Sequence, residues 1–199
     1  KLDASRCGSI HSWLDLLCAE TEVDPLASSG TTGTMSFTPR DKSDWRTQIL
    51  GGFRLQVLQE FGKLPTEADL YEKLHVGWPT HGDGHTSVFR SAHYMREFMA
   101  MGCDDHFHPM YGTPGDTDLT FLAARLRVAQ ARGDKEINVL PGLLARRAEL
   151  DAEERDRPAR VAQWVESLIS DLSGKRVFIM SPWMLLYDVA KAGLAAGKK

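Results

Sequence analysis

A short segment near the start of the chain combines the residue types that bind phosphate. Residues 28–34 read SSGTTGT and lie between a predicted helix and a strand-like MSFTP. Glycines allow backbone N–H groups to curl around an anion, and hydroxyl groups supply further donors. A solvated loop is the simpler alternative for such a stretch. We favour a phosphate-binding loop made of Ser28, Ser29, Gly30, Thr31, Thr32, Gly33 and Thr34.

This loop differs from the nucleotide loop of P-loop NTPases. Their consensus GxxxxGK[ST] places a lysine directly after the last glycine, whereas no lysine follows Gly33. The first basic residue after the loop is Arg40. Arg40 is therefore the candidate for a charged phosphate contact, and a surface charge after a strand is the alternative for it.

Histidines in the middle of the chain offer a second kind of chemistry. HGDGH (81–85) and DDHFH (104–108) contain imidazole and carboxylate groups, which are ligands of zinc and similar metals. Neither stretch has the spacing of HExxH or of a Cys/His finger, so polar loop and helix-cap histidines are the simpler explanation. The alternative functional hypothesis is a metal-dependent hydrolase or metal-binding domain that uses His81, Asp83, His85, His93, Asp104, Asp105, His106 and His108, with His75 nearby in sequence.

Three other features favour structural roles. The mixed charges of residues 146–160 have helical spacing and are typical of a solvated helical surface, with an interaction module as a further hypothesis. Cys103 precedes two aspartates, which disfavour a reactive thiolate. Met95, Phe98, Met99 and Met101 are expected to pack in the core, with an acyl tunnel as the alternative.

The composition is that of an ordinary globular protein. The chain has 199 residues, a formal charge of −3 and 42% hydrophobic residues. Its mild acidity argues against a nucleic-acid partner, and no stretch approaches the roughly 18 apolar residues of a membrane span. Three cysteines without CxxC spacing indicate reduced thiols, and we therefore expect a cytoplasmic protein.

The hydrophobic pattern alternates between helices and short apolar strands. Helices are predicted over residues 11–20, 43–62, 87–102, 117–133, 143–156, 158–172 and 181–194, and strands over 35–39, 74–79, 136–142 and 175–180. Pro158 is expected to begin a new helix, and Ser181 to cap the last one. Residues 103–116 are expected to form an irregular loop. The pattern predicts one α/β domain over residues 1–199 with a largely parallel sheet flanked by helices.

Two of these stretches resemble motifs of a known family. SSGTTG is similar to the phosphate-loop signature of the adenylate-forming (AMP-binding) superfamily, which includes acyl- and aryl-CoA synthetases and luciferases. The longer SGTTGTMSFTPRD is nearer the branch of phenylacetate-CoA-ligase-like proteins and acyl-protein synthetases. The family usually has a lysine soon after the loop, whereas this chain has Thr34, Met35 and Ser36 there and Arg40 beyond them. WPTHGDG resembles the next motif, which makes Pro79, His81 and Gly84 counterparts of residues near the acyl pocket.

The resemblance implies a fold, an activity and its partners. The chain would be part of the N-terminal domain of an acyl-CoA-synthetase-like ligase. Such an enzyme activates a carboxylic acid with ATP, accompanied by Mg²⁺, and releases pyrophosphate; the acyl group then passes to CoA or to the thiol of an acceptor protein. KRVFIMSPWMLLYDVAKAG looks like the strand and helix that precede the adenine-binding segment of the family. We therefore expect the adenine site to lie beyond Lys199 and this chain alone to be inactive.

Overall fold

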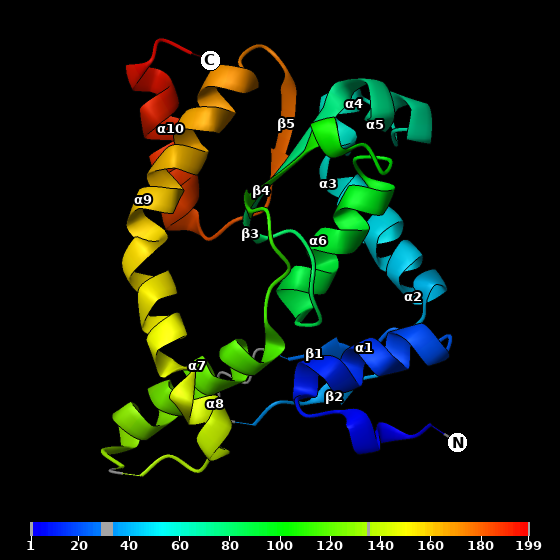
Figure 1. Ribbon diagram of the computed structural model, residues 1–199. Helices are drawn as coiled ribbons and strands as arrows, with labels where there is room; N and C mark the ends of the chain where they lie inside the picture. The colour runs from blue at the N-terminus through cyan, green and yellow to red at the C-terminus, as the bar shows by residue number, and fades with distance from the viewer. Residues whose placement is uncertain (1, 29–33, 135, 199) are drawn as a thin grey trace.

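The centre of the molecule is a parallel β-sheet, as the sequence predicts. The computed structural model describes residues 2–28, 34–134 and 136–198 (Figure 1). In this part of the chain three strands form the sheet, in the order β4–β3–β5, and both pairings are parallel. The strands are β3 (Leu74–His81), β4 (Phe107–Tyr111) and β5 (Arg176–Ile179). The predicted α/β class with helices flanking a largely parallel sheet is therefore confirmed.

The central strand, β3, is buried on both faces. Its first five residues, LHVGW, are all buried, and His75 is the one titratable side chain among them. Gly77 is required here, because a Cβ atom on it would lie 3.0 Å from Cγ1 of Ile179. The pairing of β3 with β4 becomes irregular between Trp78 and His81, and this irregularity accommodates Pro79, which has no N–H to donate.

Helices cover both faces of the sheet. In Figure 1, α9 and α10 lie on one side, and α6 lies with the α2–α4 segment on the other. The α-helices of the described residues are α1 (Ile10–Glu20), α2 (Lys42–Arg46), α3 (Arg54–Gln56), α4 (Leu58–Phe61), α5 (Glu67–Lys73), α6 (Ser87–Phe98), α7 (Thr117–Arg132), α8 (Pro141–Ala145), α9 (Arg147–Asp171) and α10 (Trp183–Ala195). Short 3₁₀ turns span Ala4–Arg6 and Asp104–His106.

Two cores stabilise these layers. The larger one joins β3 to α6 and the α2–α4 segment, and its fully buried members include Trp45, Ile49, Val76, Trp78 and Met95. The smaller one packs α9 against β5 and α10 around Trp164, Val165, Leu168 and Leu172. Met95, Phe98 and Met99 belong to the larger core, which confirms their predicted packing role.

The predicted helix over residues 43–62 is helical except at Val57, a turn residue between α3 and α4, and it is not regular. A π-helical stretch, Thr47–Phe53, interrupts it between α2 and α3 and contains Gly51 and Gly52. Two adjacent glycines weaken α-helical geometry, which allows the wider turn. The helix ends at Gly62, whose φ of 66° is left-handed as expected of a C-terminal cap.

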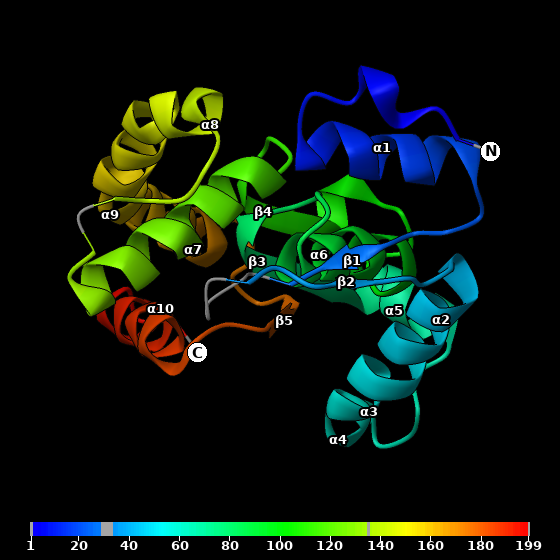
Figure 2. The same ribbon diagram turned by 90° about the horizontal axis from the view of Figure 1, so that it is seen from below.

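The residues on either side of the glycine-rich loop form a small β-hairpin. Strands β1 (Leu26–Ala27) and β2 (Phe37–Thr38) pair in antiparallel fashion. Viewed from below, the hairpin passes beneath α6 and beside α1 (Figure 2). Residues 29–33 lie outside the described part of the chain.

The expectation that Pro158 begins a new helix is wrong. A single helix, α9, runs from Arg147 to Asp171 through Pro158. A proline removes one helical hydrogen bond and crowds the preceding turn. Buried anchors on both sides, Leu150 before the proline and Trp164 after it, hold the two halves in one line.

Two loop and strand assignments are also corrected. Residues 136–142 form no strand; Ile137 and Val139 are more buried than their neighbours, but no other strand pairs with them among the described residues. Residues 103–116 are not an irregular loop throughout, since they include the edge strand β4. Pro109 is compatible with an edge strand because only one side of the strand needs partners.

Smaller points follow from the described residues. The cap position of α10 is Pro182, not Ser181, whose hydroxyl is buried without a partner. Cys7, Cys18 and Cys103 are free thiols, as expected. Across the described ranges, every helix is too short or too polar to traverse a bilayer, in agreement with the expected lack of a membrane span.

Candidate functional site

The hairpin places the two ends of the glycine-rich loop side by side. The Ser28 N–H donates to the carbonyl of Ser36 at 2.9 Å, and the Ser36 N–H donates to Oγ of Ser28 at 2.9 Å. Ser28 thus uses its hydroxyl to close the hairpin, and Thr34 is exposed. Ser29, Gly30, Thr31, Thr32 and Gly33 lie outside the described residues. The phosphate-binding role of the loop therefore stays a prediction.

Arg40 lies at the base of the hairpin, against the start of α2. Its Nη1 donates to Oε1 of Gln48 at 2.6 Å, and its guanidinium carbon lies 5.1 Å from the ring centre of Trp45. Its carbonyl accepts the Asp24 N–H at 2.6 Å. These contacts hold the side chain along α2, so a phosphate contact would require Arg40 to leave Gln48.

The hairpin is attached directly to the loop between β3 and α6. The Ala27 N–H donates to the carbonyl of His85 at 2.8 Å, and Ala27 forms a parallel bridge with Thr86. The backbone of residue 27 precedes the SSGTTGT stretch, and His85 ends the HGDGH stretch. The residues that flank the two motifs, Ala27 before SSGTTG and His85 after WPTHGDG, are therefore neighbours in space, although they are far apart in sequence.

Gly84 allows the loop after β3 to cross another loop at close range. Its φ is 137°, and a Cβ atom there would lie 2.7 Å from the carbonyl oxygen of Gly115 and 3.0 Å from Cβ of Phe89. The crossing is held by the Gly115 N–H, which donates to the carbonyl of Asp83 at 2.8 Å. Gly84 thus permits a close contact with Phe89 and is not among the lining residues of the cavity described next, so its place near an acyl pocket stays a prediction.

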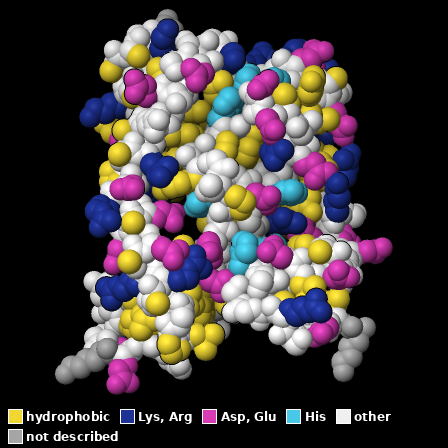
Figure 3. Space-filling view, viewed as in Figure 1, with side chains coloured by type: hydrophobic (Ala, Val, Ile, Leu, Met, Phe, Trp, Pro, Cys, Tyr) yellow, Lys and Arg dark blue, Asp and Glu magenta, His cyan; other side chains and the backbone are white. Residues whose placement is uncertain are grey.

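A cavity of about 210 Å³ opens at the carboxyl ends of β3 and β4, where they face α7 and α9. The space-filling view shows the surface hollowed beside the column of α9, with charged side chains of both signs around the hollow (Figure 3). The lining residues are Thr80, His81, Phe89, Met110, Tyr111, Asp116, Leu119, Thr120, Ala123, Arg127, Leu150, Glu153, Glu154 and Arg157. Ligands of open parallel sheets bind at this edge, because the loops that follow the strands meet there.

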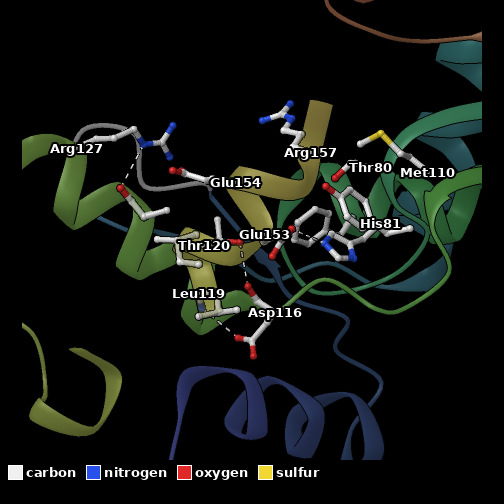
Figure 4. Close-up of a pocket in the computed structure, with 14 residues that line it drawn as sticks. Thr80, His81, Met110, Asp116, Leu119, Thr120, Arg127, Glu153, Glu154 and Arg157 are labelled. Atoms are coloured by element: carbon white, nitrogen blue, oxygen red, sulfur yellow. Dashed lines mark hydrogen bonds and ion pairs between the residues drawn. The ribbon is translucent and has the colours of Figure 1, made fainter. Parts of the chain in front are cut away.

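His81 is the predicted residue that the structure places in the cavity wall. Its ring stacks on Tyr111, with centres 4.4 Å apart, and meets Phe89 edge-on. Nδ1 lies 2.9 Å from the carbonyl oxygen of Thr113, and Nε2 lies 3.1 Å from Oε1 of Glu153 (Figure 4). The Thr113 carbonyl oxygen and the Glu153 carboxylate both accept hydrogen bonds, and together they fix the orientation of the His81 ring.

Glu153 is the carboxylate partner of His81. Its hydrogen bond with His81 lowers the pKa of Glu153, against the opposing effect of burial, and the charges of Arg157 and Arg160 lower it further. The His81–Glu153 pair therefore provides a fixed, charged wall at one end of the cavity.

Asp116 forms another fixed wall of the cavity. Its Oδ1 caps α7 by accepting the N–H groups of Asp118 and Leu119, and its Oδ2 accepts from Nη2 of Arg146 at 2.8 Å. Burial opposes the ionisation of Asp116, but Arg146 and the two amides lower its pKa overall. Asp116 is thus a satisfied carboxylate and not a free base.

Two arginines at the rim remain available to an anion. Arg127 and Arg157 are exposed, and within the described ranges neither side chain forms an ion pair. Figure 4 shows Arg127 with Glu154 at one end of the cavity and His81 with Glu153 at the other. A carboxylate or phosphate entering the cavity would meet these guanidinium groups.

The remaining histidines do not share one site with His81. His93 pairs with Asp83, and His85 pairs with Asp15 of α1. His75, His106 and His108 cluster at the amino ends of β3 and β4, with 3.0 Å between Nδ1 of His75 and Nε2 of His108. The His/Asp group predicted over residues 81–108 is therefore distributed among separate places.

The sequence analysis missed several residues of this cavity. Glu153 and Arg157 were assigned to a solvated helical surface, and only the strand order reveals that the first half of α9 faces His81. Asp116 had a local signal, because an aspartate before an apolar periodic run is typical of a helix N-cap. The comparisons add no assignment: the chain has no significant match among family models, curated proteins or solved structures.

Proposed function

We propose that this chain carries the phosphate loop and part of the acid pocket of an ATP-dependent, carboxylate-activating ligase. Residues 28–34 bind the β- and γ-phosphates of ATP, and the cavity beside His81 receives the carboxylic acid. The chain is then part of an acyl-CoA-synthetase-like N-terminal domain. CoA or an acceptor-protein thiol is the second substrate.

One observation carries this proposal. The two motifs that resemble the family were chosen from sequence alone, and the Ala27 N–H, directly before SSGTTG, donates to the carbonyl of His85, directly after WPTHGDG. A phosphate loop and an acid pocket must be adjacent, because the acid attacks the α-phosphate of the nucleotide held by the loop.

The cavity has features that suit a small organic acid. Its volume of about 210 Å³ is modest, and it combines aromatic walls from Tyr111 and Phe89 with the exposed charges of Arg127 and Arg157. Pockets that bind drug-sized molecules usually have larger volumes, of roughly 300–1,000 Å³. A compact acid therefore fits this cavity better than a long acyl chain.

The reaction has two balanced steps. A carboxylate oxygen of the acid attacks the α-phosphorus of ATP, and the α–β bond breaks to release pyrophosphate. A thiolate sulfur then attacks the acyl carbonyl, and AMP leaves. Fixed amide and hydroxyl donors of residues 28–34 would stabilise the charge that grows on the departing pyrophosphate.

Magnesium would arrive with ATP and not through a protein cage. In the part of the chain that the structure describes, the one cluster with metal-ligand spacing contains two imidazoles, which Mg²⁺ does not favour. No residue of this chain is therefore assigned to the Mg²⁺ ion.

Binding of MgATP and of magnesium pyrophosphate to the 199-residue chain, measured by isothermal titration calorimetry, tests the loop. We expect Thr31→Ala and Gly30→Val to weaken binding at least about tenfold, which corresponds to the loss of one charge-assisted hydrogen bond or more. Thr38→Ala, in the second strand of the hairpin, is the matched control and should leave binding unchanged. Equal affinities in all four proteins would exclude the loop as the phosphate site.

The acid pocket needs a reaction-level test. Carboxylate-dependent exchange of labelled pyrophosphate into ATP is measured on a chain that includes the adenine-binding region implied by the resemblance. His81→Ala should raise the KM for the acid with little change in the KM for ATP. His106→Gln, at the opposite end of the sheet, is the control. An unchanged KM for the acid in His81→Ala would remove the pocket assignment.

A further inference from the structure

A second cluster of polar side chains lies between α1 and the loop that follows β3. It contains His11 and Asp15, which face the same side of α1 at i and i+4, and His85 from the loop. One ligand-type atom from each residue lies within 4.8 Å of the other two. The cluster is separate from the cavity beside His81 and takes no part in the proposed ligase chemistry.

The spacing of these atoms suits a small divalent ion. Oδ1 of Asp15 lies 2.7 Å from Nε2 of His85, and Oδ2 of Asp15 lies 3.7 Å from Nε2 of His11. Ligands of a tetrahedral ion with bonds of about 2.0–2.2 Å lie about 3.4 Å apart. The second distance is close to this value, whereas the first is that of a hydrogen bond, so an ion would replace this bond and the exposed Asp15 carboxylate would move.

The backbones that carry the ligands are fixed before any ion binds. The N–H groups of Ile10 and His11 donate to the carboxylate of Asp118 at 3.0 and 3.1 Å, which anchors the first turn of α1 on α7. The carbonyl of His85 accepts the Ala27 N–H at 2.8 Å. Preorganised ligands lose less conformational entropy on binding.

Two buried polar atoms next to the cluster have no hydrogen-bond partner among the described residues. His85 is only 5% exposed, and its Nδ1 has no hydrogen-bond partner. Thr117 is fully buried, its hydroxyl has no partner, and its backbone nitrogen lies 3.5 Å from Nδ1 of His11. A metal-bound imidazole carries a hydrogen on its second nitrogen, so zinc binding through Nε2 of His11 would require Nδ1 to give up the Thr117 N–H, which it accepts at 3.5 Å.

The donor set selects the kind of ion. Two imidazoles and one carboxylate suit zinc and similar borderline metals, whereas magnesium and calcium prefer oxygen ligands. Arg90 is close enough to affect the pKa of His85, but its charge is balanced by Asp24 and Asp83. Three protein ligands leave one tetrahedral position open to solvent.

We propose that His11, Asp15 and His85 form a zinc-class metal site with one open coordination position. The site joins α1 to the β3–α6 loop beside the β1–β2 hairpin. Only one of its ligands, His85, belongs to the His/Asp group predicted over residues 81–108. The other two ligands, His11 and Asp15, come from α1.

Metal titration of the chain tests this site. The protein, dialysed against a chelator and then against chelator-free buffer, is titrated with ZnCl₂ by calorimetry and with CoCl₂ by visible absorption. We expect one ion per chain and the intense visible bands of tetrahedral cobalt. His11→Gln and Asp15→Asn should each weaken zinc binding at least about tenfold.

Matched variants make the result decisive. His93→Gln removes another imidazole that pairs with a carboxylate, and His106→Gln alters the three-histidine cluster; both should retain wild-type affinity. Asp15 is exposed, so Asp15→Asn should keep the wild-type circular dichroism spectrum, while zinc should no longer raise its melting temperature. Absent binding, or a loss caused by His106→Gln instead of Asp15→Asn, overturns the proposal. MgATP binding is measured separately, so failure here leaves the proposed function untouched.

Discussion

At the scale of single residues, the environment of an imidazole decides what it can do. His81 lies between two acceptors and is held in the cavity wall by Glu153. His75, by contrast, lies among other basic groups, and burial and the charges of His106 and Lys175 lower its pKa to about 4. The same residue type is therefore held by a carboxylate at one end of β3 and lies among other basic groups, as a neutral and buried imidazole, at the other.

The depressed pKa of His75 predicts a loss of stability in acid. The unfolded chain takes up a proton near pH 6.5, whereas the folded chain resists it until about pH 4. The contribution of His75 is therefore fully present above pH 6.5 and is lost as the pH falls through 4. We expect the free energy of unfolding, measured with urea, to decrease by about 1–3 kcal/mol between pH 7 and pH 4.5.

The control for this prediction is His75→Gln, which cannot titrate. The variant should show a shallower dependence on pH over the same range. The neighbouring groups that also titrate or carry charge are His106, His108, Lys175, Asp105 and Asp171. A slope identical to that of the wild type would assign the acid sensitivity to these neighbours.

Gly84, where the loop after β3 crosses the loop that contains Gly115, gives a second prediction for a single residue. Gly84→Ala should lower the free energy of unfolding by about 2 kcal/mol or more, because its φ of 137° is unfavourable for alanine and the new Cβ would contact the Gly115 carbonyl. Gly193→Ala is the matched control: it lies inside α10 with open space around its Cβ, and it should stabilise the protein by about 0.5–1 kcal/mol. Urea titration of both variants measures the contrast, and equal effects would contradict the close crossing.

At the scale of elements, local patterns predicted most helices and strands but not their neighbours. The apolar run of β3, the amphipathic helices α6 and α7, and the glycine stops at positions 62 and 133 were all readable. The strand β4 was missed because its Pro109 and flanking glycines resemble a loop. Residues 136–142 have a strand-like composition but pair with no strand among the described residues. No local signal in the sequence distinguishes this segment from β4.

The most consequential error was to predict a helix break at Pro158, because the candidate cavity depends on the continuity of α9. Glu153 and Arg157 lie before Pro158, while Trp164 and Leu168 anchor the helix after it. The second half of the helix packs on the sheet and so fixes the first half opposite His81. Pairings of this kind depend on tertiary packing and cannot be derived from propensity.

Replacement of Pro158 tests this continuity. In a continuous helix, Pro158→Ala restores a hydrogen bond to the carbonyl of Glu154 and should stabilise the protein by about 1–2 kcal/mol in urea titration. If Pro158 began a separate helix, the same change would be neutral or unfavourable, because proline is preferred at the first helical position. Ala159→Gly, one residue later, is a reference for the propensity of an exposed helical position and should be destabilising.

At the scale of the whole molecule, a few long-range contacts hold the N-terminal helix on the rest. Asp118 of α7 accepts the first amides of α1 across 108 residues of sequence, and it is buried. The hairpin bond between Ala27 and His85 is a second such contact. Neither contact was predictable from sequence, because the local sequence pattern of each segment does not indicate which distant segment it will contact.

Asp118→Ala should release α1 without unfolding the sheet. The variant removes the acceptor for the amides of Ile10 and His11, and we expect faster hydrogen exchange over residues 10–20 with little change in α9. Asp134→Ala, an exposed aspartate after α7, is the control. Unchanged exchange in α1 would mean that packing alone holds the helix in place.

His85 serves two neighbours at once, since its carbonyl holds the hairpin while its imidazole faces α1. Thermodynamic reciprocity then applies to any pair of molecules that engage these two sides. If an anion bound at the hairpin loop changes the affinity of the imidazole for a cation by some factor, the bound cation must change the affinity for the anion by the same factor. Under the two proposals, His85 would therefore link phosphate binding at the hairpin to metal binding beside α1.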